Sequence, residues 1–172
     1  MITMLFLAVS LAAQSVPNQP VPNQPVAVLD LARYSGSWHE IARFEQSFQK
    51  KCVGDVTAHY SLRDDGRIRV INRCRTRDGS ISEAEGEARR VDGQPGALKV
   101  RFAPRWLSWL PFVWGDYWVI ALDPDYGWTL IGSPSRDYLW ILSRTPRLAP
   151  ETYDAIVDTA KARGYDVSKL IA

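Results

Sequence analysis

Very few residues of this chain have side chains suited to catalysis or metal binding. Its only histidines are His39 and His59, and its only cysteines are Cys52 and Cys74, among 172 residues. A zinc site needs more ligands than these, so we predict no metal site and no cofactor. Glu40 adds one further acid or base, but no motif for hydrolysis, hydride transfer or phosphate binding accompanies any of these residues. We therefore do not expect an enzyme.

The aromatic residues offer a different chemistry, the binding of apolar molecules. The chain contains seven Trp, seven Tyr and five Phe, and aromatic side chains suit β-strands and apolar cavities. Residues 104–114 concentrate them in one segment that includes Trp106, Trp109, Leu110, Phe112 and Trp114. A small domain cannot bury all of these side chains, so we expect some to be exposed. Such a surface contacts a membrane, a ligand or another protein, or folds over an entrance as a lid, and the sequence leaves these alternatives open.

Length and charge limit the class of protein further. With 172 residues, 46% of them hydrophobic, the chain can bury one substantial core, which indicates a single domain. Its 21 basic and 19 acidic residues are spread along the sequence and leave a net charge of +2. No basic tract is present to bind a phosphate backbone, so we expect no nucleic acid partner.

The N-terminal residues have the composition of a targeting segment followed by a linker. Residues 1–13 contain a short apolar run ending in small residues, which predicts a signal peptide and export. No Lys or Arg precedes this run, so either the true start lies upstream or the amino terminus supplies the only positive charge. No Cys follows it as a site for a lipid anchor, so we expect a soluble or peripheral protein of the periplasm. Residues 14–27 contain the pentamer Val-Pro-Asn-Gln-Pro twice and predict an extended, unpacked tether before a domain at 28–172.

Beyond the tether, short alternating runs of apolar and polar residues are separated by turn residues, which is typical of an antiparallel all-β domain. Eight runs are expected as strands: Trp38–Glu45, Val56–Leu62, Ile68–Thr76, Ser82–Arg90, Leu98–Ala103, Asp116–Leu122, Trp128–Gly132 and Tyr138–Arg144. The sequence therefore predicts an eight-stranded antiparallel up-and-down β-barrel. Apolar residues at helical spacing predict one amphipathic helix over Pro150–Arg163, packed outside the barrel, with a short closing strand over Asp166–Ile171.

Alternation also predicts which side chains face the barrel interior. In the fourth strand, small residues alternate with glutamates, which places the small ones inside: Ala84, Gly86 and Ala88. The glutamates of the opposite face are expected in water: Glu83, Glu85 and Glu87. An eight-stranded barrel is just wide enough to hold one small ligand when its inward residues leave space.

The two cysteines lie at the same end of neighbouring strands. Cys52 precedes the second strand and Cys74 lies near the end of the third. In an exported chain such a pair predicts a disulfide, and a reactive thiol is the alternative.

Three motifs, in order and with these strands between them, resemble those of the lipocalin family, most closely its bacterial outer-membrane branch. They are Gly36-Ser37-Trp38, the acidic turn Asp123-Pro124-Asp125-Tyr126, and Arg144 near the end of the last barrel strand. The resemblance covers about Leu31 to Ile171. It departs at His39, where relatives of this branch usually have Tyr, and in the missing anchor Cys.

The resemblance implies that Trp38 plugs one end of the barrel and that the guanidinium of Arg144 packs across its indole. Such a cation–π contact is worth roughly 0.5 to 2 kcal/mol. Gly36, Asp123 and Tyr126 are the other framework residues that it implies. Because connections alternate between the two ends of an up-and-down barrel, the aromatic segment 104–114 is expected at the opposite, open end.

Alternation and the resemblance together predict the residues that face the cavity and bind a ligand: Tyr60, Asn72, Phe102, Tyr117, Val119, Tyr138 and Trp140. We expect Asn72, Tyr117 and Tyr138 to lie near the mouth, within reach of a ligand head group. We expect no charge cluster inside, so a charged head group would stay at the mouth.

The function that the resemblance implies is the binding, storage or transport of a small hydrophobic molecule, a fatty acid or lysophospholipid, in the bacterial cell envelope. A barrel that docks another protein through segment 104–114 is the second hypothesis. An enzyme acting in the cavity is the third. The sequence does not decide between a monomer and a dimer.

Overall fold

The computed structural model describes residues 21–103, 107 and 109–172. The predicted signal peptide, the first part of the tether and Trp106 lie outside the described residues. The described strands and main helices are α1 (Leu31–Tyr34), β1 (Gly36–Phe44), β2 (Cys52–Leu62), β3 (Ile68–Thr76), β4 (Ile81–Val91), β5 (Gln94–Arg101), β6 (Gly115–Leu122), β7 (Trp128–Gly132), β8 (Leu139–Ser143), α2 (Pro150–Ala162) and β9 (Leu170–Ile171). Single turns of 3-10 helix lie at Ser47–Gln49, Pro111–Val113 and Val167–Lys169.

The eight long strands form a closed antiparallel barrel, as the sequence predicts. Each strand pairs with the next from β2 to β8, β8 pairs with β1, and β1 pairs with β2 to close the ring. The closing strand expected over Asp166–Ile171 is shorter than predicted, because residues 167–169 form a 3-10 turn and only β9 pairs with β1.

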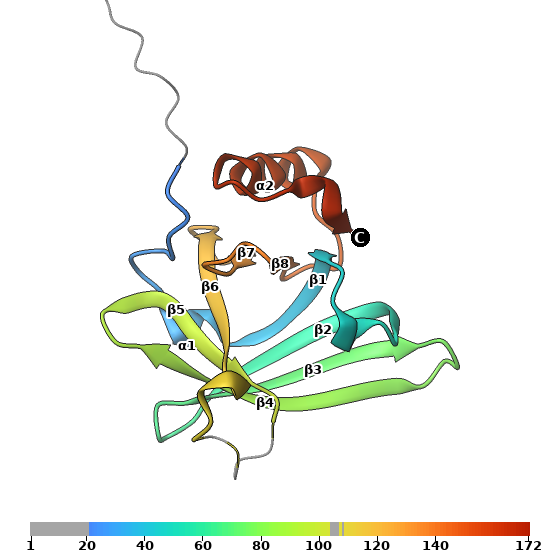
Figure 1. The fold of residues 1–172 in the computed structure, drawn as a ribbon. Coiled ribbons are helices and arrows are strands. Elements are labelled where there is room, and N and C mark those ends of the chain that lie inside the picture. Colours follow the sequence, from blue (N-terminus) through green and yellow to red (C-terminus); the bar gives the residue numbers. More distant parts are fainter. Residues whose placement is uncertain (1–20, 104–106, 108) are drawn as a thin grey trace, which may run out of the picture.

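Helix α2 covers one side of the barrel from outside, as Figure 1 shows. Its buried residues Ile156 and Ala160 pack in a cluster with Ile120, Leu130 and Ile141. The strand residues of this cluster face outward and alternate along their strands with inward residues such as Ile131. Strands β6, β7, β8 and β1 therefore bury both faces, which explains why β7 contains almost no exposed residue.

The outer face of β3 and β4 is polar instead. Arg69 donates two hydrogen bonds to Glu85, at 2.8 and 2.7 Å, and Arg73 pairs with Glu83 at 2.7 Å. Both glutamates are in water, as predicted. Glu87 is a correction to the expected exposure, because it is buried beside Arg101.

The burial of Glu87 has a visible cause in the aromatic segment. Trp114 lies on the outer wall, with its ring 4.4 Å from the Arg89 guanidinium carbon and 5.1 Å from that of Arg101. Glu87 accepts hydrogen bonds from Arg67 at 2.8 Å and from Arg101 at 3.3 Å. One end of segment 104–114 therefore packs against the outside of the barrel.

The described part of the tether is extended but not unpacked. The Val26 N–H donates to the Val119 carbonyl at 2.8 Å, and Gly96 leaves room for the backbone of Val26. Asn23 donates to the Ser133 carbonyl at 2.9 Å and accepts from the Tyr165 hydroxyl at 3.2 Å. Proline removes backbone donors without removing acceptors, so a proline-rich segment can still be held by side chains and carbonyls.

The plugged end of the barrel is built around Trp38, which is fully buried. The Arg144 guanidinium carbon lies 3.8 Å from the centre of the indole ring, so the contact that the resemblance implies is present. Arg144 also donates to four backbone carbonyls of one short segment, those of Arg33, Tyr34, Ser35 and Ser37. This one side chain thus fastens β8 to α1 and the start of β1.

The other framework residues lie at this same end. Gly36 has a φ of +100°, and a Cβ there would lie 3.3 Å from the Arg144 guanidinium. The Asp123 carboxylate accepts from the Gly127 N–H at 2.9 Å and shapes the β6–β7 turn. Tyr126 accepts from the Asp30 N–H at 3.0 Å. The three sequence motifs therefore meet in space as one plug.

Candidate functional site

Above this plug the barrel contains a cavity of about 540 Å³. A volume of this size is within the range of ligand pockets in proteins. Its opening lies at the end formed by the connections β1–β2, β3–β4, β5–β6 and β7–β8, as the alternation of connections predicts. The small residues Ala58 and Ala84 line its wall and leave it open, while Val70, Val100 and Leu142 make it apolar.

A cluster of three tyrosines closes the floor of the cavity: Tyr60 and Tyr117 line it, and Tyr34 lies behind them against Trp38. The Tyr117 hydroxyl lies 2.7 Å from the Tyr34 hydroxyl and 2.9 Å from that of Tyr60, so the three phenols form one hydrogen-bonded chain. The Tyr34 ring in turn packs 5.1 Å from the Trp38 ring. Tyr117 therefore points deeper than the sequence predicts, toward the plug, and its hydroxyl is not near the mouth.

Burial raises the pKa values of these floor tyrosines. The pKa of Tyr60 is raised to about 12, and those of Tyr34 and Tyr117 are also raised, in each case mainly because burial disfavours the phenolate. All three phenols therefore stay neutral in the folded protein up to strongly alkaline pH.

We predict that the folded protein loses stability steeply above pH 10. Below pH 10 the phenols are protonated in both states, so their contribution is fully present. Between pH 10 and about 12, tyrosines ionise in the unfolded chain while the floor tyrosines remain protonated. Each floor tyrosine then lowers the free energy of unfolding by about 1.4 kcal/mol per pH unit. Urea unfolding at a series of pH values measures the slope.

The matched variant for this measurement is Tyr34→Phe, which removes one titrating phenol and keeps the ring. Above pH 10 the unfolding free energy of this variant should fall less steeply with pH than that of the wild type. The difference in slope should be about 1.4 kcal/mol per pH unit, which corresponds to one titrating proton. Equal slopes in the two proteins would show that the floor is not the source of the alkaline effect.

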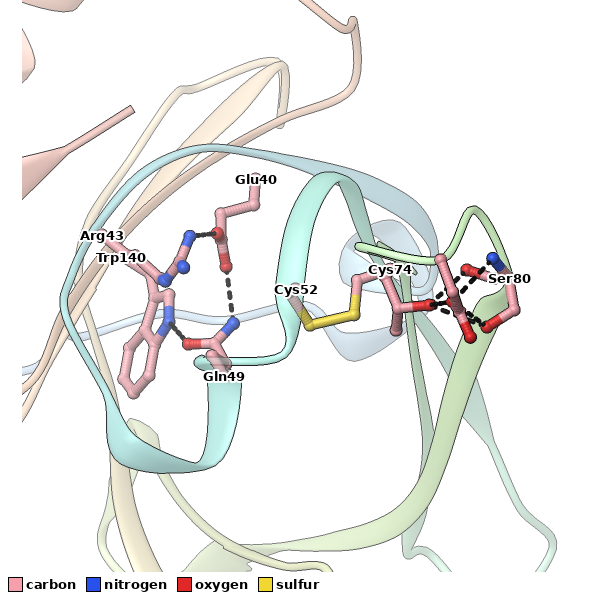
Figure 2. The surroundings of a disulfide bond; sticks show 9 residues. Glu40, Arg43, Gln49, Cys52, Cys74, Ser80 and Trp140 are labelled. Atoms are coloured by element: carbon pink, nitrogen blue, oxygen red, sulfur yellow. Dashed lines mark hydrogen bonds and ion pairs between the residues drawn. A yellow bond between two sulfur atoms is a disulfide. The ribbon is translucent and has the colours of Figure 1, made fainter.

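A polar chain at one side of the mouth joins three elements, as Figure 2 shows. Glu40 of β1 accepts from Arg43 at 2.6 Å and from the Gln49 amide at 2.9 Å. Gln49, in the β1–β2 connection, accepts in turn from the Trp140 indole N–H at 3.2 Å. The cavity therefore contains a charge that the sequence analysis did not expect, although Arg43 neutralises the Glu40 carboxylate.

The disulfide predicted from the sequence is present between Cys52 and Cys74, which both line the cavity near its mouth (Figure 2). Their Cα atoms are 5.5 Å apart and their separation in sequence is 22 residues. The bond ties the start of β2 to β3, where bulges interrupt the ladder. It thus reinforces a part of the sheet where the pairing is irregular.

We predict that the double variant Cys52→Ala/Cys74→Ala unfolds with a free energy about 3 kcal/mol lower than the oxidised wild type, as a loop of this length implies. Urea unfolding of the two proteins measures the difference. Wild type treated with a reductant is the control and should match the double variant. A difference below about 1 kcal/mol would contradict the constraint that we assign to the bond.

The structure brings most of the predicted ligand-binding residues together. Six of them line the cavity: Tyr60, Asn72, Phe102, Tyr117, Tyr138 and Trp140. Val119 does not, because it is fully buried in the cluster around Trp38. Its inward direction was predicted correctly, but at that depth inward side chains contact one another and leave no space.

The sequence analysis missed other residues of the cavity. Glu40 lies two positions after Trp38 in the same strand, so alternation alone could have placed it inside. Gln49 and Lys51 belong to an irregular connection, where no periodic signal exists. Tyr34, which supports the floor without lining the cavity, was also missed, because it belongs to a helix of one turn that is too short to show a helical period.

The rim of the mouth is apolar and exposed. At least one exposed large side chain lies in or directly beside each of its four connections. These side chains are Phe48, Ile81, Phe102, Trp109, Phe112 and Tyr138. Trp109 and Phe112 are the most exposed, at 77% and 79%, and Leu110 is half-buried. The exposure expected for part of segment 104–114 is therefore present.

The residues with catalytic chemistry are dispersed. Cys52 is held in the disulfide, and His59 lies on the outside, with its Nδ1 2.9 Å from the Ser37 hydroxyl. Within the described ranges, no group of three or more His, Cys, Asp or Glu side chains could hold a metal ion. Among the described helices, none is long and apolar enough to cross a membrane.

A closed antiparallel barrel with one end plugged and an apolar cavity open at the other defines a class of proteins that hold small molecules inside. The family model for the lipocalin-like domain matches residues 29–172. The chain belongs to the lipocalin family. Membership of this family supports the binding or transport of a small hydrophobic molecule rather than catalysis.

Relatives of known sequence agree with this assignment. The chain is 47% identical to temperature-induced lipocalin-1 of Arabidopsis thaliana over 145 residues, which cover 83% of this chain and 77% of the relative. It is 46% identical, with the same coverage, to outer membrane lipoprotein Blc of Escherichia coli (strain K12). It is 32% identical to apolipoprotein D of Mus musculus, over 82% of this chain and 74% of that relative.

A solved structure supports the fold independently. Insecticyanin from the tobacco hornworm Manduca sexta superposes with a TM-score of 0.67, covering 91% of this chain and 86% of its own. Because the two sequences are 23% identical, this likeness shows the fold alone.

Proposed function

We propose that the protein binds one fatty acid or lysophospholipid in its cavity and stores or carries it in the bacterial cell envelope. The observation that carries the proposal is the apolar cavity of about 540 Å³, closed by the Trp38 plug at one end and open at the other. Burying about a dozen methylenes at roughly 0.8 kcal/mol each yields about 10 kcal/mol. Association costs about 4 kcal/mol or more, so burial of the acyl chain leaves at most about 6 kcal/mol, which corresponds to a dissociation constant of tens of micromolar. Contacts of the head group at the mouth add to this affinity.

The charged end of such a ligand would stay at the mouth. Lys51 and Gln49 line the cavity there and can meet a carboxylate or phosphate, whereas Glu40 is already paired with Arg43. Deeper in the cavity the wall is mostly apolar and offers no charged partner, so a charged group there would have to be desolvated at a large cost. This polarity supports a ligand with one charged end and an apolar chain.

The exposed rim supports a peripheral contact with a membrane. Phe48 lines the cavity at its opening, and Trp109 and Phe112 are exposed in the β5–β6 connection at the same end of the barrel. Trp is favoured at lipid interfaces. Relatives at 39% to 46% identity are named outer membrane lipoproteins. We therefore propose the periplasm or the periphery of the outer membrane as the location of this protein.

Native mass spectrometry of protein purified from the periplasm without detergent, followed by lipid extraction, tests the proposal. We expect fatty acid or lysophospholipid at close to one molecule per barrel. Emptied protein should take up oleate or lysophosphatidylethanolamine with the affinity stated above. A barrel that is recovered empty and binds neither lipid would refute the proposal.

The exposed rim also supports a second function, the docking of another protein. Trp109 and Phe112 present a large apolar surface for such a contact. An empty barrel in the mass spectrometry experiment, together with loss of a copurifying protein on substitution of Trp109 and Phe112, would favour this second function.

A further inference from the structure

We infer that the cavity recognises a hydroxyl group in the middle of the ligand's acyl chain, through Asn72. This inference rests on the proposed function and names its ligand class more closely, as hydroxylated fatty acids or the lysolipids made from them. The reason is that Asn72 is an amide placed in an otherwise apolar part of the wall.

The position of Asn72 in strand β3 is central. Inward residues of β3 run from Ile68 and Val70, which belong to the core around Trp38, through Asn72 to Cys74 near the mouth. Asn72 is four residues from the end of the strand at Thr76. With a usual strand rise and tilt, it lies about 10 Å below the rim. This depth corrects the expectation from the sequence that Asn72 lies near the mouth: a head group there would not reach it, but the middle of an acyl chain would.

The neighbours of Asn72 in the sheet offer its amide no hydrogen-bond partner. In the ladders with β2 and β4, its partners are Ala58 and Ala84, and all three residues line the cavity. A methyl side chain cannot form a hydrogen bond with an amide. The next inward pair of this ladder toward the plug is Val70 and Gly86, and the Phe102 ring packs over Gly86. No polar side chain of the described wall is therefore paired with Asn72.

The hydrogen bonding of the Asn72 side chain agrees with this position in the wall. The side-chain oxygen of Asn72 is buried and has no hydrogen-bond partner. Buried polar groups in folded proteins are satisfied in the great majority of cases, so an unpaired one indicates a missing partner. The floor hydroxyls are bonded to one another and do not supply it.

A hydroxyl is the ligand group that suits this amide best. The terminal torsion of Asn has broad two-fold preferences, so a half-turn presents either the oxygen or the nitrogen to the cavity. A hydroxyl donates to the amide oxygen in one orientation and accepts from the amide nitrogen in the other. A plain methylene does neither, and leaves the amide buried against an apolar chain.

The test compares three C18 fatty acids by titration calorimetry: stearate, 12-hydroxystearate and 2-hydroxystearate. We expect the wild type to bind 12-hydroxystearate about tenfold more tightly than stearate, as one added hydrogen bond implies. The hydroxyl of 2-hydroxystearate lies beside the carboxylate at the mouth, so it should give no such preference. Equal binding of stearate and 12-hydroxystearate by the wild type would overturn the inference without any variant, and would indicate that only water pairs with Asn72.

Asn72→Leu, which has a similar shape and no polar group, is the informative variant. It should bind stearate at least as tightly as the wild type and should lose the preference for 12-hydroxystearate. Ser82→Ala, at a polar cavity residue nearer the mouth, is the matched control and should keep the preference. A preference that survives in Asn72→Leu would overturn the inference, whereas failure of all three fatty acids to bind the wild type would overturn the proposed function itself.

Discussion

Replacing Trp38 by alanine is expected to lower the free energy of unfolding by about 3 to 5 kcal/mol, which is the usual cost of truncating a buried Trp. The indole is fully buried. It packs beneath the Arg144 guanidinium at 3.8 Å and donates to the Tyr34 carbonyl at 2.9 Å. Removal of the indole leaves a void between the floor tyrosines and Arg144, and the side chains on the two sides cannot fill it. Urea unfolding followed by circular dichroism measures the loss.

Two further variants make this result specific. Trp109→Ala removes an indole that is 77% exposed, so it should change stability by less than about 0.5 kcal/mol. Trp38→Phe keeps an aromatic ring under Arg144 and should cost less than Trp38→Ala. If Trp109→Ala and Trp38→Ala cost the same, Trp38 is not the plug of this barrel.

The second large effect is expected on binding, from Ala84→Trp. Ala84 lines the open part of the cavity, so an indole at this position occupies space that the ligand would fill. If it displaces about four methylenes of an acyl chain, the loss is about 3 kcal/mol, or more than 100-fold in affinity. Fluorescence competition or calorimetry with oleate measures this loss. The fold should survive, because the new side chain enters a void and not a packed core.

The neighbouring residue provides the matched control. Glu85 faces away from the cavity and pairs with Arg69 on the outer surface, so Glu85→Trp adds the same side chain to the same strand on the other face. It should bind oleate as the wild type does. Equal losses in the two variants would mean that disturbance of β4, and not occupation of the cavity, controls binding.

The sequence predicted the strands well where alternation is regular. Strands β3 and β7 have the predicted bounds, because turn residues limit each of them closely. Strand β2 begins at Cys52 and not at Val56, since register shifts around Gly54 break the alternation on which the prediction depended. Strand β5 begins at Gln94 and not at Leu98. The prediction missed its first residues because Pro95 and Gly96 have the composition of a turn, although they lie in the strand.

The site was predicted less completely than the fold. Alternation fixes the face of the sheet on which a side chain lies, and so it identified six residues that line the cavity. It contains no information about depth, which is why Tyr117 was placed at the mouth and Val119 in the cavity. Depth depends on strand tilt and on which side chains fill the plug, and both are properties of the whole barrel.

The one-sided cover of helix α2 has a consequence for how the barrel moves. Backbone amides of β7 and β8 lie between two apolar layers, so their hydrogen exchange requires a large part of the molecule to unfold. Toward the mouth, strands β3 and β4 have the solvated ion pairs Arg69–Glu85 and Arg73–Glu83 outside and the cavity inside, so this part of the wall can open locally. Breathing of the barrel is therefore concentrated in the wall that contains Ala58, Asn72 and Ala84. A ligand broader than the cavity would therefore displace this wall, while the wall beneath α2 stays rigid.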